Sequence, residues 1–224
     1  MLLAILACGE RLESIDPTTL MPQDLSGMDL HGKAMNRIDF SGKLMIGVIM
    51  YSAEIIEANF TNADLREANL SDTIANRTIF NGADLRGANL DRLCFHGATW
   101  DGAKLDPRWH KVVFVIEEKL RPNQDLSGFD LSKLCLYNYD LRNAILLKAD
   151  LSETQLSLAN LARANLQDAN LNAARLVNTN LAGANLMGAN VTEEQLANAL
   201  LCETILPNGQ ISNMGCDRLP GTTP

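Results

Sequence analysis

Several patterns that would indicate a chemical function are missing from this 224-residue chain. Three histidines and five cysteines do not supply the paired CxxC spacing of a zinc site. The formal net charge of −8 argues against a nucleic-acid binder, because phosphate binding needs a surplus of clustered lysine and arginine. The longest apolar run, Met1 to Ala7, is far shorter than the ~20 residues of a membrane span. We therefore expect no metal, no cofactor, no nucleic-acid partner and no membrane insertion.

What the chain does have is a five-residue period. From Gln23 to Pro107 it divides without a gap into seventeen steps, and the third residue of every step is apolar. A period of five fits neither a helix at 3.6 residues nor a flat strand at 2. It predicts a backbone that turns a corner after each short strand-like step. The third residue and a small first residue, often alanine, then point inward.

A longer period of twenty residues is superimposed on the first. Phe40, Phe60, Phe80 and Trp100 all occupy third positions and lie twenty residues apart. Four five-residue sides per coil would place these rings in one interior column, where stacked aromatic side chains stabilise each other beyond simple burial.

The pattern resumes at Gln124 for fourteen more steps, with third positions from Leu126 to Val191. Its register has slipped by one residue relative to the first series, so we expect the intervening segment to be an insertion with its own structure. The sequence thus contains two repeat blocks, residues 23–107 and 124–191.

Steps such as ADLRE, ANLSD, ADLRG and ANLAR carry an A(D/N)LXX signature that resembles the pentapeptide-repeat family. The style of the repeats is most similar to that of cyanobacterial and thylakoid-lumen members. The resemblance implies an all-β solenoid, a right-handed quadrilateral β-helix. Combined with the register slip, it predicts two blocks with short α-helical caps.

Three segments lie outside the repeat: residues 1–22, 108–123 and 192–224. Asp106 as N-cap and Pro107 at the first helical position predict a helix that ends near Arg121. Its apolar stripe either plugs the open end of the second block or belongs to a helix looped out of one continuous solenoid. The stripe consists of Trp109, Val112, Val113, Ile116 and Leu120.

The two chain ends are also expected to act as caps. Thr192 and Gln195 have capping-box spacing, which predicts a helix over Glu193 to Leu201 that closes the last coil. At the other end, the segment from Met1 to Cys8 is either an apolar cover for the first coil or a lipoprotein signal, although it lacks a basic start.

No arrangement of catalytic residues is evident. His31, His96 and His110 are far apart in sequence, and the first two occupy outward repeat positions. Cys94 and Cys135 fill outward second positions, where a free thiol is tolerable and no activating neighbour is evident. Asp64 and Asp84 stack one coil apart with arginines beside them, and stacked asparagines form structural ladders. We therefore expect a protein that is not an enzyme.

An apolar band interrupts the polar exterior of the first block. Its members fall at second or fourth positions, which point outward, and contiguous exposed apolar area usually marks an interaction site. We expect the band either to be covered by residues 1–6 or to be a patch that binds a second chain. The band consists of Leu44, Ile46, Ile49, Tyr51, Ile56, Ile74 and Ile79.

Cys202 and Cys216 flank a Pro-Asn-Gly turn outside the repeat, and they are the two cysteines that we expect to pair. A disulfide here would fasten the C-terminal segment over the last coil. It would require an oxidising compartment such as a periplasm or a thylakoid lumen, and without it we expect a cytoplasmic protein. Similarity to lumenal family members favours the disulfide.

These observations favour a non-enzymatic structural or protein-interaction module with an unidentified protein partner, or with a second copy of the chain in a homodimer. The family resemblance suggests an alternative, a DNA mimic that acts on DNA gyrase, as quinolone-resistance members do. A stack of thirty-one steps would be ~37 Å long, and duplex DNA of that length carries about twenty phosphate charges. The net charge of −8 is much smaller, which argues against mimicry.

Overall fold

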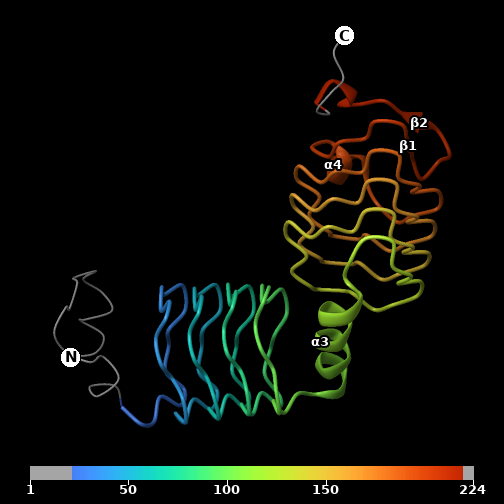
Figure 1. The fold of residues 1–224 in the computed structure, drawn as a ribbon. Helices are drawn as coiled ribbons and strands as arrows, with labels where there is room; N and C mark the ends of the chain where they lie inside the picture. Colours follow the sequence, from blue (N-terminus) through green and yellow to red (C-terminus); the bar gives the residue numbers. More distant parts are fainter. Residues whose placement is uncertain (1–21, 219–224) are drawn as a thin grey trace. The chain divides into compact units, whose positions relative to one another are not determined.

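The computed structural model describes residues 22–218, apart from the side chains of residues 114–119 and 218. The chain divides into two compact units, residues 1–111 and 112–224. In each unit the backbone winds into a stack of coils (Figure 1). Because one side of a coil contributes only one bridging residue to its neighbours, the stack consists of isolated parallel bridges rather than long strands.

The bridges repeat at an interval of twenty residues, which is one coil of four five-residue sides. In unit 1, Asp24 pairs with Leu44, Leu44 with Asp64 and Asp64 with Asp84, all in parallel. Main-chain N–H groups donate to the neighbouring coil on either side. Leu25 N donates to Leu44 O at 2.7 Å, and Leu44 N donates to Gln23 O at 3.0 Å. Stacking therefore satisfies the buried backbone polar groups of an inner coil.

Each corner of a coil is a turn whose last residue, the fifth of the step, has a positive φ. Glycine adopts this conformation readily, as at Gly27 with φ of 67°, but Leu158 also adopts it with φ of 61°. Aspartate or asparagine at the second position supports the turn. Asp24 Oδ1 accepts the main-chain N–H of Ser26 at 2.9 Å, the side-chain–backbone bond for which these residue types are favoured in turns.

The interior of unit 1 contains the predicted aromatic column. Phe40 and Phe60 stack at 4.8 Å between ring centroids, Phe60 and Phe80 at 5.4 Å, and Phe80 and Trp100 at 4.5 Å. The prediction of four sides and of this column is confirmed. Unit 2 uses leucine at the same third positions, where Leu146 and Leu166 are fully buried.

Helix α3 spans Pro107–Lys119 and begins where the sequence predicts. Trp109, Val112, Val113 and Leu120 of the predicted apolar stripe are buried. The side chain of Ile116 lies outside the described residues. Asp106, the expected N-cap, accepts a hydrogen bond from Gly87 N at 3.1 Å through its carboxylate.

Helix α4 spans only Glu193–Leu196, although Thr192 and Gln195 form the predicted capping box. The prediction that this helix continues to Leu201 is wrong. Beyond α4 the chain returns to the coil, because Leu200 bridges Asn180 and Ile205 bridges Asn185 in parallel. Inter-coil pairing thus prevails over the local helical preference of the segment ANALL.

The described chain ends on this last coil. Strand β1, Thr204–Ile205, pairs antiparallel with strand β2, Ile211–Ser212. A 3₁₀ helix, η1, follows at Cys216–Arg218. Among the residues that the structure describes, no helix is long and apolar enough to cross a membrane.

Candidate interaction surfaces

Several outward charges of unit 1 are paired with opposite charges on the same side or on the next coil. Arg66 contacts Asp64 at 2.7 Å, and Arg86 contacts Asp84 at 2.6 Å, each within a single step. Arginine and aspartate thus neutralise one another along this side, as the sequence predicts. A strongly acidic surface does not result.

In each pair the arginine lowers the pKa of its aspartate. Hydrogen bonds from Arg86 lower the pKa of Asp84 from 3.8 to about 2, and Arg66 lowers the pKa of Asp64 in the same way. Both carboxylates are therefore ionised throughout the physiological pH range. A depressed pKa that an adjacent arginine fully explains indicates a structural ion pair rather than a catalytic acid.

Amide side chains form part of the exterior of unit 2. Asn190 Nδ2 donates to Asn170 Oδ1 at 3.0 Å, and Asn170 Nδ2 donates to Asp150 Oδ1 at 3.0 Å. The same Asn170 Oδ1 accepts the main-chain N–H of Asn172 at 3.2 Å. These bonds link successive coils and support the corner, so the ladder is explained without a ligand.

The seven residues of the predicted apolar band point outward, but the structure does not bring them together on one side. Three of them are exposed: Leu44 is 43%, Tyr51 41% and Ile74 37% accessible. Ile46, Ile49, Ile56 and Ile79 are half-buried. Because a side is five residues long, successive steps place the band around the coil. Residues 1–6, the expected cover, lie outside the described residues.

Four members of the band nevertheless lie on two adjacent sides of one coil, before and after a single corner. Leu44 and Ile46 belong to one step, Ile49 and Tyr51 belong to the next, and Gly47 with φ of 64° turns the chain between them. We call these four apolar residues the Gly47 corner. Their neighbours on adjacent coils are mostly polar, since Leu44 lies between Asp24 and Asp64 and Ile49 lies between Asp29 and Asn69.

An aromatic contact borders this corner. The His31 and Tyr51 rings stack at 5.0 Å with 10° between their planes, and His31 Nδ1 lies 2.7 Å from Asp29 Oδ1. The histidine and aspartate are both exposed. Tyr51 therefore presents a ring that is fixed on one face by His31, which reduces the entropy that a partner would lose on binding it.

The other residues considered for chemistry show structural contacts. His96 and His110 are exposed, as expected for surface histidines. Within the described residues, no group of three or more histidine, cysteine or acidic side chains is placed to hold a metal ion. Cys135 is only 6% accessible, and Cys94 and Cys135 are both disulfide-bonded, so the prediction of free thiols at these outward positions is wrong.

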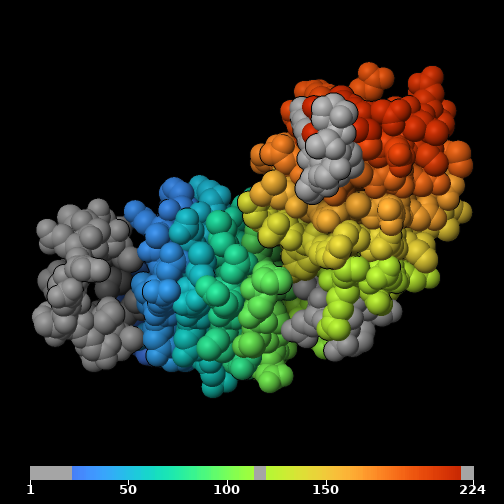
Figure 2. Space-filling view, turned by 45° about the horizontal axis from the view of Figure 1, so that its top comes forward, coloured from blue at the N-terminus to red at the C-terminus, as the bar shows by residue number. Residues whose placement is uncertain are grey.

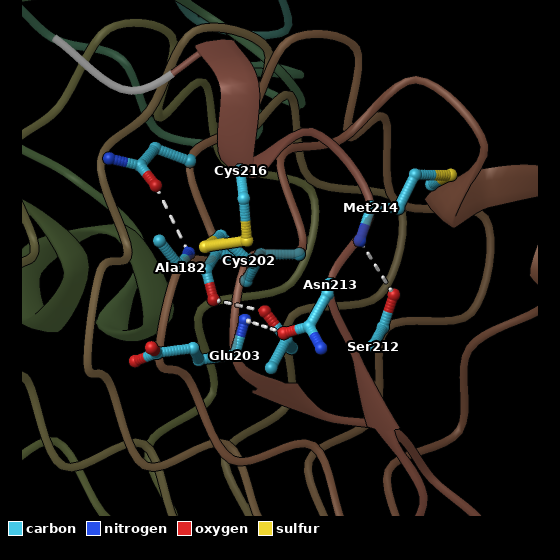
Figure 3. The surroundings of a disulfide bond; sticks show 10 residues. Ala182, Cys202, Glu203, Ser212, Asn213, Met214 and Cys216 are labelled. Carbon is cyan, nitrogen blue, oxygen red and sulfur yellow. Dashed lines mark hydrogen bonds between the residues drawn. A yellow bond between two sulfur atoms is a disulfide. The ribbon is translucent and has the colours of Figure 1, made fainter. Parts of the chain in front are cut away.

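Cys202 and Cys216 are brought together in a disulfide with a Cα–Cα distance of 4.6 Å (Figure 3). Cys202 belongs to the last coil, because its carbonyl accepts Gly183 N at 2.7 Å. Two further bonds hold the returning segment. Leu201 N donates to Met214 O at 2.9 Å, and Glu203 N donates to Asn213 Oδ1 at 3.3 Å. The disulfide thus links η1 to the last coil.

Unit 2 has exposed apolar residues that sequence reasoning missed. They belong to outward second, fourth or fifth positions and to the terminal segment. Figure 2 shows one face of the outer surface of unit 2, coloured from yellow-green to red. Writing the second block in rows of twenty residues would have found those within the repeat, because the rows show which outward columns contain apolar residues. The set comprises Tyr137, Ile145, Leu158, Val177, Met187, Ile211 and Met214.

Stacked four-sided coils, bridged every twenty residues around apolar columns, define a β-solenoid. The family model of pentapeptide repeats matches residues 63–99 and, in overlapping segments, residues 125–201. These matches cover just over half of the chain. The chain therefore belongs to the pentapeptide-repeat family.

Solved structures of other pentapeptide-repeat proteins match this chain. HetL, involved in heterocyst differentiation regulation in the cyanobacterium Nostoc sp. strain PCC 7120, is 25% identical, with 94% of this chain and 98% of HetL covered and a TM-score of 0.30. Full-length QnrB1, a plasmid-mediated fluoroquinolone resistance protein, is 14% identical. The match covers 88% of this chain and 97% of QnrB1, with a TM-score of 0.28. A pentapeptide-repeat protein of the Arabidopsis thaliana thylakoid lumen is 17% identical. The match covers 82% of this chain and 79% of that protein, with a TM-score of 0.14. No curated protein sequence is significantly similar to this chain.

Proposed function

We propose that this protein is a non-enzymatic protein-interaction module. The observation that carries the proposal is the apolar Gly47 corner, where Leu44 and Tyr51 are exposed on an exterior whose other outward positions are largely polar. Burial of exposed apolar and aromatic side chains is the usual source of affinity between proteins. Leu44 is 43% and Tyr51 41% accessible, so much of their surface is available to a partner.

The solenoid supports this role because its side chains are held in fixed positions. The coils on either side of the Gly47 corner fix its backbone, through bonds such as Gly47 N to Arg66 O at 2.8 Å and Ile46 N to Ser26 Oγ at 3.2 Å. A prearranged surface loses little conformational entropy on binding. Repeat proteins commonly use such extended surfaces for recognition.

We further propose that two repeat blocks with caps form the module. The break in the twenty-residue bridges between Lys104 and Asp125 supports this division. At the C-terminal end, Gln195 Nε2 donates to Leu171 O at 2.8 Å and to Ala174 O at 2.9 Å, which places α4 against main-chain carbonyls of the preceding coil.

DNA mimicry is the alternative, and the charge pattern disfavours it. Residues 23–111 contain twelve acidic and ten basic side chains. Fifth-position residues alternate in sign along one corner, where Arg37 and Arg77 contact Glu57 at 2.8 and 2.6 Å. A phosphate-like array would need acidic residues without such partners.

An affinity-capture experiment tests the proposed function. The immobilised full chain should retain a specific protein from an extract of its source cell, and Tyr51→Glu should lose that protein by placing a charge in the apolar corner. Ser71→Glu is the matched control, because Ser71 occupies the same position one coil further on. Equal capture by both variants, or capture of no specific protein by the wild type, would contradict the proposal.

A further inference from the structure

One side of unit 2 combines large apolar and amide side chains without charge. Parallel bridges connect Ile145 to Asn165, Asn165 to Asn185 and Asn185 to Ile205, so these second positions form one column. The fourth positions form a column beside it. Apart from Asp125 in the first coil, neither column holds a charged residue. We call this surface the uncharged side, and its central members are Ile145, Leu147, Asn165, Gln167, Asn185 and Met187.

The uncharged side extends into the terminal segment. Ile205 and Pro207 continue the two columns, since Gly188 N donates to Pro207 O at 3.1 Å. Ile211 of β2 pairs with Ile205 and is 67% accessible. Ile145 and Met187 are 40% and 46% accessible, so exposed apolar side chains occur at both ends of the surface.

Two coil levels of this side are each chemically alike across their width, whereas the level of Asn185 and Met187 is mixed. The level of Ile145 and Leu147 is apolar, and the level of Asn165 and Gln167 is amide. A two-fold axis parallel to the coil stack exchanges the two columns and leaves every level at its own height. Two copies related by that axis would bring Ile145 against Leu147 and Asn165 against Gln167, which at these two levels is the self-complementarity of an isologous interface.

The two corners that border the uncharged side carry opposite charges at the level of Asn165 and Gln167, whereas Lys148 and Glu203 lie on these corners at other levels. Arg163 immediately precedes the step of residues 164–168, and Asp168 ends it. Both side chains are exposed, and within residues 22–218 neither forms an ion pair. Exchange of the columns places Arg163 of one copy opposite Asp168 of the second copy, and Asp168 opposite Arg163. Two ion pairs would thus flank the apolar and amide levels, which fixes the relative orientation of the copies.

From this arrangement we infer that the uncharged side is a self-association surface, whose partner is a second copy of this chain in parallel orientation. The absence of charge on the surface lets two molecules of net charge −8 approach each other there. The inference deepens the proposed function by naming one surface and one partner. It concerns unit 2, whereas the Gly47 corner belongs to unit 1.

The size of the surface determines the strength of the association. Coils stacked at about 4.8 Å make the side roughly 20 Å long, and five extended residues make it roughly 15 Å wide. Its footprint of about 300 Å² per copy is smaller than the ~800 Å² of a standard interface. The dimer is therefore weak and forms only at high protein concentration.

Sedimentation velocity of the purified full chain, from low-micromolar to near-millimolar concentration, tests the inference. The wild type should shift from monomer to dimer across this range. Asp168→Arg should weaken association more than about tenfold, because it places Arg163 opposite a second arginine twice per dimer. The double variant Arg163→Asp with Asp168→Arg exchanges the charges and should restore association.

Glu153→Arg is the matched control. Glu153 is also an exposed acidic residue at a fifth position, with φ of 55° as at Asp168, but it lies at a corner that does not border the uncharged side. This variant should dimerise like the wild type, and thermal unfolding should verify that each variant folds. A wild type that stays monomeric at every concentration overturns the inference, as does a charge-swapped variant that fails to recover. Either result leaves the capture of another protein at the Gly47 corner untouched.

Discussion

The two units build the same coil from different interiors. Unit 1 fills one interior column with Phe40, Phe60, Phe80 and Trp100, and places methionine or isoleucine at several other third positions, whereas unit 2 uses leucine almost throughout. An aromatic ring stacks on the ring one coil away, so its packing depends on the identity of its neighbours. A leucine column instead repeats one shape. The difference indicates that unit 1 is more sensitive to substitution at single interior positions.

The largest effect is expected in the aromatic column. Phe60→Ala removes a fully buried ring that stacks between Phe40 and Phe80 and should lower the free energy of unfolding by about 3–5 kcal/mol, through lost burial and an unfilled cavity. Chemical denaturation measures this. Thr61→Ala, on the outward neighbour of the same step, should cost much less. A loss below about 1 kcal/mol for Phe60→Ala would contradict the interior assignment.

The next largest effect concerns the end of unit 2, which has a covalent link that the repeat itself does not supply. Replacing both Cys202 and Cys216 with alanine should destabilise the protein by about 3 kcal/mol, because the bond closes a loop with a sequence separation of 14. Denaturation of the double variant measures the loss. Alkylation of the non-reduced wild type, followed by mass spectrometry, provides a second check. Recovery of both cysteines as alkylated peptides would refute the disulfide and the inference of an oxidising compartment.

A smaller effect is expected for the ion pairs on the exterior of unit 1, where unit 2 has an amide ladder instead. Asp84→Asn keeps an oxygen that can accept the N–H of Arg86 but removes the charge, and should cost about 1–2 kcal/mol at pH 7. Because the folded pKa of Asp84 is about 2 and its ordinary value is 3.8, the charged carboxylate stabilises the fold above about pH 4. That contribution is lost as the pH falls through about 2. Denaturation at several pH values should therefore show the two proteins converging below pH 2, and a difference that persists there would exclude the ion pair as the cause.

The smallest effect concerns the corners, which are alike in both units. Leu158 has a positive φ that leucine tolerates poorly, so Leu158→Gly should stabilise unit 2 by up to about 1 kcal/mol. This net gain is the free energy released by removing the backbone strain, minus the entropy cost of ordering a more flexible glycine on folding. Gly27→Ala is the reverse test in unit 1. A Cβ there meets no atom within 4 Å, so any loss of stability comes from φ alone. A stabilised Gly27→Ala would contradict this explanation of the corners.

Much of the coil could be predicted because the repeat couples each residue to a fixed position. The phase of the five-residue period places Ala75 and Trp100 in the interior as reliably as the common leucines. Prediction was weakest where the period ends. The segment after Thr192 has strong helix formers, yet α4 stops at Leu196 because the following residues pair with the coil of Asn180 and Asn185.

The candidate surfaces were harder to predict, for two physical reasons. Ile49 and Ile74 are both outward and apolar, but their position in the twenty-residue coil puts them on different sides. Outward apolar residues that are close in sequence therefore need not share one surface. In unit 2, Ile145 and Met187 are separated by many polar residues in sequence, and only the alignment of coils reveals that they share the uncharged side. The disulfide bonding of Cys94 and of Cys135 has no local sequence signal.

We expect binding activity to belong to the Gly47 corner rather than to exposed aromatic residues in general. Tyr51 in unit 1 and Tyr137 in unit 2 provide a matched test, because both occupy fourth positions and are 41% and 54% accessible. The measurement is capture of the protein partner by Tyr51→Glu and by Tyr137→Glu, at equal amounts of folded protein. We expect Tyr51→Glu to lose the partner and Tyr137→Glu to retain it. Loss by Tyr137→Glu alone, or the same result for both variants, would contradict the claim.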